Sequence, residues 1–257
     1  MKITSHKIDI SEVKNEIKNH FSALPSKVDS FYEDHLIESD FYRLLADGKP
    51  AGVVAVHKES MIIMFIVSKE FKRYGQELFY EARRLSEVTC AYVPTCDEFY
   101  LSVALEASKK MEFQAYFFKE TENTVKFTKE EAVFSLEKAT KKDIEKIIED
   151  TDDFFNPLES HIENGRVYKG MVDGNSVSYG IIEESRIFDD VSSIGMIVVD
   201  CQRQKGYGAL TLKSLRNICH QNNITPIAGC WYYNHLSKKT LQNAGFYSDT
   251  RMLKIHF

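Results

Sequence analysis

The segment that most restricts the fold is a glycine-containing loop between an apolar run and an amphipathic segment. The loop, CQRQKGYGAL at residues 201–210, follows the apolar run IGMIVV at 194–199. Leucines and a cysteine then recur at spacings of three and four residues, which predicts a helix with one apolar face from about Tyr207 to Gln221. The predicted order is therefore a strand, a glycine loop and a helix.

Two glycines at such a junction indicate an anion site. Gly206 and Gly208 carry no Cβ, so backbone N–H groups can converge on a ligand, and the helix N-terminus adds partial positive charge. Arg203 and Lys205 bring full positive charges to the same loop. We predict a phosphate ligand, and a diphosphate fits such a loop best. A turn with a helix-starting glycine is the simpler alternative.

The familiar nucleotide motifs do not match this loop. A dinucleotide-binding loop requires a third glycine and, about twenty residues later, an acidic residue at a strand end. This chain has Thr211 at the position of the third glycine and lacks the acidic residue. A Walker A loop requires a lysine directly after its second glycine, whereas Gly206 is followed by Tyr207. The sequence therefore favours a different phosphate-containing ligand.

The pattern from residue 132 onward predicts an α/β (α+β) fold on a mixed sheet. Asp173-Gly174-Asn175 is a turn signal that joins two alternating segments into a hairpin, and Thr140 is a helix cap. The expected strands lie at 132–136, on both sides of the turn within 166–188, and at 193–199, 225–233 and 247–257, and the expected helices at 140–148, 207–221 and 236–244. Helices should flank the faces of the sheet.

The first half of the chain repeats this plan in weaker form, with an Asp47-Gly48 hairpin and an apolar strand at 62–67. We therefore predict two domains, 1–130 as a degenerate copy and 131–257 as the complete copy. Two unrelated α/β halves are the alternative. Alignment of the halves pairs Gly75 with Gly206, Glu77 with Gly208, Leu101 with Asn234, and Glu112 with Gly245.

The second half resembles the GCN5-related N-acetyltransferases (GNAT), an acyl-CoA-dependent family. Val198-x-x-x-x-Arg203-x-x-Gly206-x-Gly208 is similar to motif A of the family, and Asn234-x-x-Ser237-x-x-x-Leu241-x-x-x-Gly245-Phe246 is similar to motif B. The segment SLEKAT at 135–140 is similar to the family's first strand and helix start. The match covers about 132–257. The first half resembles the same fold, so the whole chain resembles a tandem GNAT protein with mixed sheets flanked by helices.

The resemblance implies acetyl-CoA as co-substrate and assigns roles to particular residues. The backbone of Ile197 and Val198 would hold the pantetheine arm as an added strand would. Asn234 would either bind pantetheine or cap the last helix. The pyrophosphate would be held by the loop residues Arg203, Gln204, Lys205, Gly206, Tyr207, Gly208 and Ala209.

The resemblance also implies transfer of an acetyl group to a primary amine of a small molecule, such as an antibiotic or a metabolite. Family members commonly place a tyrosine seven residues after the motif B asparagine as proton donor, but this chain has Leu241 there. We take Tyr233, at a predicted strand end, as the best substitute. Core packing or a surface position explains Tyr232, Tyr233 and Tyr247 more simply.

A second function class stays open. The predicted central strand contains no acid, and Glu183 and Glu184 on the preceding strand are the nearest carboxylates. A non-catalytic acyl-CoA-binding module is therefore the alternative to an acetyl-CoA-dependent N-acyltransferase.

Composition excludes several other classes. The chain has 257 residues and a net charge of -5, with Lys and Arg scattered, so we expect no nucleic-acid partner. No apolar run is long enough to span a membrane and no apolar leader is visible, so we expect a soluble, cytoplasmic protein without a membrane partner, either a monomer or a homodimer. The eight histidines lack metal-ligand spacing, so we expect no metal. Five widely spaced cysteines indicate reduced thiols.

Overall fold

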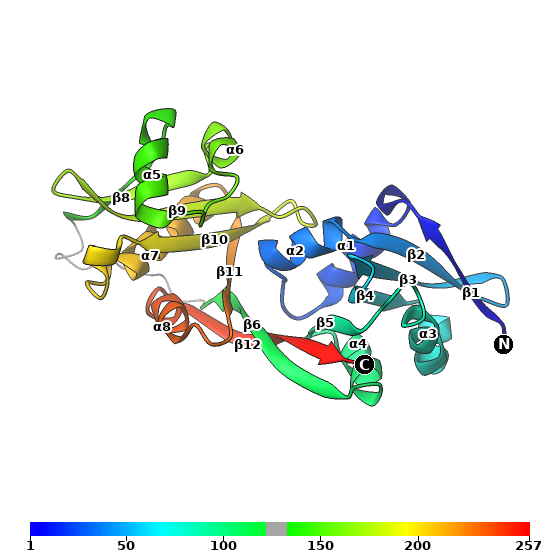
Figure 1. Cartoon of the computed structure of the whole chain (residues 1–257). Helices are drawn as coiled ribbons and strands as arrows, with labels where there is room; N and C mark the ends of the chain where they lie inside the picture. Colours follow the sequence, from blue (N-terminus) through cyan, green and yellow to red (C-terminus); the bar gives the residue numbers. More distant parts are fainter. Residues whose placement is uncertain (122–132) are drawn as a thin grey trace. The chain divides into compact units, whose positions relative to one another are not determined.

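The computed structural model describes residues 1–121 and 133–257 (Figure 1). The predicted domain boundary between residues 130 and 131 lies outside these residues, as does Ala132, the first residue of the predicted strand at 132–136. No helix in the described ranges is both long and apolar enough to cross a membrane.

The described elements of the first half include both strands and helices. In chain order they are β1 (Ile3–Ile8), η1 (Ile10–Glu12), α1 (Lys14–Ala23), α2 (Ser30–Ile37), β2 (Asp40–Ala46), β3 (Lys49–His57), β4 (Met61–Val67), η2 (Lys69–Tyr74), α3 (Gly75–Ala82), β5 (Cys90–Pro94), α4 (Glu98–Glu106) and β6 (Lys110–Glu120).

The second half repeats that order from its first described strand onward. Its elements are β7 (Ser135–Lys138), η4 (Lys141–Asp143), α5 (Ile144–Thr151), α6 (Leu158–Glu163), β8 (Val167–Val172), β9 (Asn175–Glu184), β10 (Val191–Val198), η5 (Asp200–Gln202), α7 (Tyr207–Gln221), β11 (Thr225–Trp231), α8 (His235–Asn243) and β12 (Phe246–His256). The agreement of both series, 3-10 turns included, supports a duplicated architecture over two unrelated halves.

The chain divides into two compact units that do not coincide with its two halves. The units comprise Met1–Phe117 with Trp231–Tyr233 and Asp249–Phe257, and Phe118–Cys230 with Asn234–Ser248. The end of β12 pairs antiparallel with β5 in the first unit, from Met252 opposite Pro94 to His256 opposite Cys90. These bounds differ from the contiguous ranges 1–130 and 131–257 because strand pairing, and not chain order, decides which residues pack together.

Each unit contains a mixed sheet, and the first five strands of each half, β1 to β5 and β7 to β11, pair in the same order. In the first unit the strands follow the order β1-β2-β3-β4-β5-β12, and in the second β11-β10-β9-β8-β7. All neighbours are antiparallel except two parallel pairs, β4 with β5 and β10 with β11. The mixed α/β fold expected from the sequence is confirmed.

Local sequence explains where the elements of the second unit begin. Thr140 and Asp143 form a reciprocal capping box before α5. Asp173 and Gly174 both have positive φ, 48° and 77°, as a tight hairpin turn between β8 and β9 requires. Helix α7 spans the residues predicted for it, and it packs closely on β9, where a Cβ on Gly180 would lie 2.9 Å from the Thr211 methyl group.

Histidine 57 is a buried titratable group in the first unit. It ends β3, is 4% exposed, and its Nδ1 has no hydrogen-bond partner within the described residues. The His35 ring of α2 lies 4.7 Å from the His57 ring. Burial lowers the pKa of His57 below its usual value, and the charges that His35 and Lys58 can carry lower it further, while Glu38 opposes them.

This burial predicts a specific loss of stability in acid. As the pH falls below about 6.5, the unfolded chain binds a proton that folded His57 resists, so the free energy of unfolding declines. The contribution is complete above that pH and is lost as the pH falls through the folded pKa. His57→Leu should remove this part of the decline, so its stability relative to the parent rises on acidification. Urea unfolding across a pH series measures it, and a pH-independent difference would contradict it.

Candidate functional site

The hydrogen-bond ladder between β10 and β11 is short. It joins Val191 to Thr225 and ends with Ser193 opposite Ile227, although both strands continue. On its other side β10 stays paired with β9 as far as Val198 opposite Ser178. The backbone groups of β10 that face away from β9 beyond Ser193 are therefore outside any described ladder. Ile197 and Val198, predicted to hold an extended arm, lie in this part and are half-buried.

The loop after β10 folds back into the start of α7. Gln204 and Gly206 both adopt positive φ, 64° and 87°, and Gly206 is the N-cap of α7. A Cβ built on Gly206 meets no protein atom within 4 Å. The left-handed backbone therefore explains this glycine, and the space in front of it is open.

Backbone amides at the loop remain available to a ligand. The Arg203 amide donates to Asp200 and the Ala209 amide donates to Gly206. Within the described residues, the amides from Gln204 to Gly208 have no acceptor. Because these amides precede or begin a helix of 15 residues, they form a concave donor set suited to an anion.

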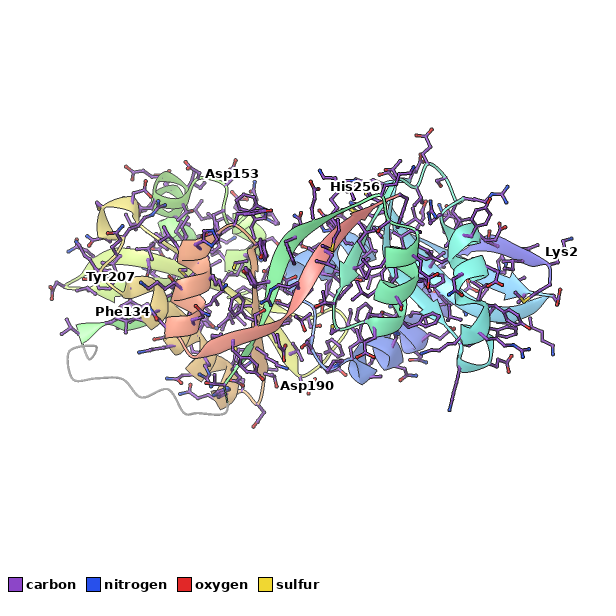
Figure 2. The ribbon with its side chains drawn as sticks, turned by 90° about the horizontal axis from the view of Figure 1, so that it is seen from below. Lys2, Phe134, Asp153, Asp190, Tyr207 and His256 are labelled. Atoms are coloured by element: carbon purple, nitrogen blue, oxygen red, sulfur yellow. The ribbon has the colours of Figure 1, made fainter. Side chains whose placement is uncertain are left out.

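Gly208 has a different reason to be glycine. A Cβ there would lie 3.0 Å from Met196 Sδ of β10 and 3.0 Å from the Thr240 methyl group of α8. The residue thus lets α7 approach both elements closely. At the same end of the helix, the Tyr207 ring stacks 6.5 Å from the Phe134 ring (Figure 2).

The two cationic side chains of the loop are exposed, and each pairs with a residue three positions earlier in the chain. Arg203 pairs with Asp200 at 2.6 Å, and the Lys205 ammonium donates to the Gln202 side chain at 2.8 Å. Both residues are exposed. Exposed pairs of this kind contribute little stability, so both cations can turn toward an incoming anion.

Asn234 caps the last helix. Its Oδ1 accepts a hydrogen bond from the Ser237 amide at 3.0 Å, at the N-terminus of α8. The capping alternative is thereby confirmed, and a contact of Asn234 with a ligand stays a prediction.

The candidate proton donors and acids fall in different units. Tyr233 is 53% exposed and belongs to the first unit, where its ring meets the Tyr232 ring edge to face at 5.1 Å. Tyr247 belongs to the second unit, with the Lys119 ammonium 5.2 Å from its ring. Glu184 pairs with Arg166 at 3.1 Å. Leu241, at the usual donor position, is a buried residue of α8.

The corresponding place in the first unit is built differently. The β4–β5 ladder ends with Ile62 opposite Ala91. The buried Tyr100 hydroxyl donates to the Ile62 carbonyl at 3.1 Å, and the buried Tyr32 hydroxyl donates to the Ile63 carbonyl. These two tyrosines supply donors where the ladder ends, a feature that sequence analysis missed.

The helix start after β4 also lacks the open glycine. Gly75 has an ordinary helical φ of -59°, and its amide donates to Lys72. A Cβ on Gly75 would lie 2.7 Å from the Phe99 ring, so packing against α4 explains this glycine. Gly75 therefore does not reproduce the conformation of Gly206.

The structure also corrects the predicted counterpart of Asn234. Asp97, and not Leu101, is the N-cap of α4, and it accepts a hydrogen bond from the Tyr100 amide. On this basis Tyr100 corresponds to Ser237 of α8. Asp97 and Asn234 each precede the last helix of their half, and this sequence signal could have identified the correspondence.

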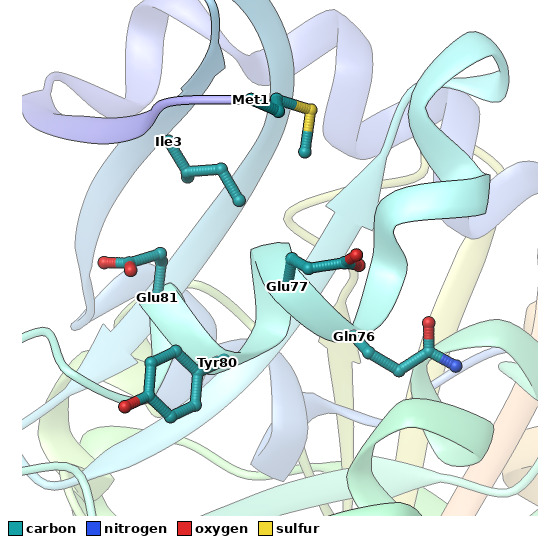
Figure 3. Close-up of a pocket in the computed structure, with 6 residues that line it drawn as sticks. All are labelled: Met1, Ile3, Gln76, Glu77, Tyr80 and Glu81. Atoms are coloured by element: carbon teal, nitrogen blue, oxygen red, sulfur yellow. The ribbon is translucent and has the colours of Figure 1, made fainter.

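An open pocket of about 510 Å³ lies over α3 and the start of β1 in the first unit (Figure 3). Its lining includes two carboxylates and no cationic side chain, so it suits an anion poorly. The lining residues are Met1, Ile3, Gln76, Glu77, Tyr80 and Glu81. No group of three or more potential metal ligands comes together in 1–121 or 133–257.

Comparisons with known proteins agree with this geometry. Residues 9–121 match a family model described as an acetyltransferase (GNAT) domain. The match falls on the copy that we expected to be degenerate, and the degeneracy itself stays a prediction. No curated protein sequence matches the chain.

Solved structures share the fold over the whole chain. A GNAT-family acetyltransferase from Colwellia psychrerythraea is 16% identical, covers 100% of both chains and has a TM-score of 0.88. A tandem GNAT protein from the clavulanic acid biosynthesis pathway is 11% identical over 98% of this chain and 97% of its own, with a TM-score of 0.62. A GCN5-related N-acetyltransferase from Sphaerobacter thermophilus is 10% identical over 98% and 94%, also at 0.62. These likenesses establish the GNAT fold.

The glycine loop yields a test with a matched control. Gly206→Val should weaken acetyl-CoA binding at least about tenfold, because losing one hydrogen bond to a charged group costs roughly 1.5–3 kcal/mol. Gly174 also has positive φ and open space around its Cβ, so Gly174→Val should cause a similar strain of ~1–2 kcal/mol without loss of affinity. Calorimetry and urea unfolding measure both quantities.

Calorimetric titration of the parent protein with acetyl-CoA also gives the number of binding sites per chain. We expect one acetyl-CoA per parent chain, because the Ile62 and Ile63 carbonyls of β4 already accept from tyrosine hydroxyls and Gly75 lacks the left-handed backbone of Gly206. Equal affinity in Gly206→Val and the parent, or two sites per chain, would contradict the assignment.

Proposed function

We propose that this chain, which has the GNAT fold and whose residues 9–121 match the GNAT domain model, transfers an acetyl group from acetyl-CoA to a primary amine of a small molecule. The C-terminal copy, 131–257, is the proposed acyl-CoA-binding part. The observation that carries the proposal is the early end of the β10–β11 ladder, followed by the unpaired loop amides before α7.

Acetyl-CoA suits these features in two ways. The amides of the pantetheine arm can continue the hydrogen bonding of β10 where β11 leaves it, as an added strand does. The pyrophosphate carries the negative charge that the helix N-terminus, Arg203 and Lys205 attract. The loop residues Gln204, Gly206, Tyr207 and Gly208 would contribute through their amides, whereas Arg203 and Lys205 would contribute through their side chains.

The proposed reaction is a direct transfer. The neutral amine attacks the thioester carbonyl carbon, a C–N bond forms, and the C–S bond breaks with departure of the CoA thiolate. The amine nitrogen then loses a proton to a base or to water, and the thiolate gains one. Tyr233 is the proposed donor to sulfur, since it is an exposed residue that directly precedes Asn234 in the chain.

One observation favours the alternative, a non-catalytic acyl-CoA-binding module. Leu241 is 4% exposed at the position where the resemblance expects a tyrosine, so this position of α8 supplies no hydroxyl. A thiolate is nevertheless a good leaving group, and catalysis without a donor is chemically feasible.

Release of free CoA separates the two functions. The parent protein should release CoA from acetyl-CoA in the presence of one or more primary amines from a panel, and Gly206→Val should release much less at subsaturating acetyl-CoA. Mass spectrometry of the acylated amine establishes that the acetyl group was transferred and not hydrolysed. Binding of acetyl-CoA without release for any amine would favour the binding module.

Tyr233→Phe tests the proposed donor. The variant keeps the ring and loses the hydroxyl, so turnover should fall at least about tenfold while acetyl-CoA affinity stays constant; general acid catalysis typically contributes 10²- to 10⁴-fold. Tyr247→Phe is the matched control, because Tyr247 is 43% exposed and lies on β12. Turnover of Tyr233→Phe within about twofold of the parent would assign Tyr233 to packing.

A further inference from the structure

A group of stacked aromatic rings lies in the first unit, where the end of β11 meets β6. The Tyr232 amide donates to the Gln114 carbonyl at 3.0 Å and anchors the turn that follows β11. We call the group the aromatic stack; its members are Phe113, Tyr116, Trp231, Tyr232 and Tyr233.

The rings of the stack are in close, ordered contact. Tyr232 is parallel to both Phe113 and Tyr116, with centroids 4.4 and 4.8 Å apart. Tyr233 stands at 85° to Tyr232 and at 63° to Trp231, each at 5.1 Å. The turn therefore presents Trp231 and Tyr233 at a steep angle to each other, and Tyr233 contacts the parallel rings through Tyr232.

The inner end of the stack already holds a cation. The Arg251 guanidinium lies 4.2 Å from the centroid of the buried Tyr116 ring. The Arg251 amide donates to Thr95 Oγ1 at 2.9 Å, and the Arg251 carbonyl accepts from the Thr95 amide at 2.8 Å. The chain itself thus uses one face of this stack for a cation–π contact.

The outer end is open. Trp231 is 57% exposed and Tyr233 is 53% exposed, and no cation of the described residues lies over either ring. Two large aromatic side chains so exposed on one turn form an unusual surface for a protein. Indole and phenol rings are the strongest neutral attractors of organic cations among side chains.

We propose that Trp231 and Tyr233 form a binding site for an organic ammonium group. The faces of the two rings supply the attraction, and the contacts of Tyr233 with Trp231 and with Tyr232 of the parallel stack hold the pair together. The charge of the ligand, and not its apolar surface alone, determines the affinity.

As a statement about the acceptor, this inference rests on the proposed acyl transfer. The turn that carries both rings leads directly into Asn234 and α8. An acceptor held there would carry a cationic group in addition to the amine that reacts, because the reacting nitrogen must be neutral to attack a thioester. The proposal thus names a substrate class: amines that bear a second, permanently or largely protonated nitrogen.

Choline and 3,3-dimethyl-1-butanol form a matched pair of probes, since they have nearly the same shape and differ in charge. The chain contains one tryptophan, Trp231, so its fluorescence reports on this site alone. Choline chloride should change the emission of the full-length protein saturably, against sodium chloride at equal ionic strength, and the neutral alcohol should not. Choline has no primary amine, so the result does not depend on acyl transfer.

Variants at two tyrosines complete the test. Tyr233→Ala should weaken choline binding about two- to fivefold, since an exposed cation–π contact is worth ~0.5–1 kcal/mol. Tyr233→Phe keeps the ring and should bind as the parent does. Tyr80→Ala, at a tyrosine that is 58% exposed on α3, is the control and should also bind normally.

Each outcome decides the matter. No saturable change with choline, an equal response to the alcohol, or unchanged affinity in Tyr233→Ala would overturn the proposal. Selective choline binding without CoA release from any amine would leave the site standing and remove the proposed acyl transfer. CoA release without choline binding would overturn the ammonium site and leave the proposed acyl transfer standing.

Discussion

The arrangement of the second unit depends on the point at which the parallel ladder between β10 and β11 ends. Backbone N–H and C=O groups inside a protein require partners, and beyond Ser193 strand β10 has a neighbour on the β9 side only. The first unit meets the same requirement with side chains, because Tyr100 and Tyr32 donate to the carbonyls of Ile62 and Ile63. Where the parallel ladder ends, the same topology thus has two carbonyls with side-chain donors in one copy and an available strand in the other.

Helix α7 is held in position by contacts at both of its ends. At its start, Gly208 allows close approach to β10 and α8. Further along, the buried Arg216 donates to Glu120 at 2.6 Å and to the Thr121 carbonyl at 2.7 Å, and His220 shares Glu120. Buried ion pairs of this kind add little net stability but specify geometry. The proposed contact of the α7 N-terminus with a diphosphate would benefit from such a fixed position.

The two glycines of the loop, and the two exposed rings near Asn234, illustrate how one segment combines structural and chemical demands. Gly206 is required by its left-handed backbone and faces open space, whereas Gly208 is required by packing. Trp231 and Tyr233 are exposed although apolar surface is normally buried. Exposed aromatic residues that contradict the usual preference for burial are natural candidates for ligand contacts.

The sequence alone predicted the duplicated α/β order, the Asp173-Gly174 hairpin and the bounds of α7, because turn residues, caps and helical spacing are local signals. It also predicted the strand, glycine loop and helix of the candidate anion site. It did not predict α6, a helix of only six residues, nor that Asp97 is the counterpart of Asn234.

Only the tertiary structure decided that the end of β12 pairs with β5 and that tyrosine hydroxyls donate to the β4 carbonyls. It also decided that the Tyr233 ring contacts Tyr232, which stacks with Phe113 and Tyr116. These contacts join residues far apart in the chain. Their partners are set by strand pairing and packing over the whole unit, which no local spacing of residues encodes.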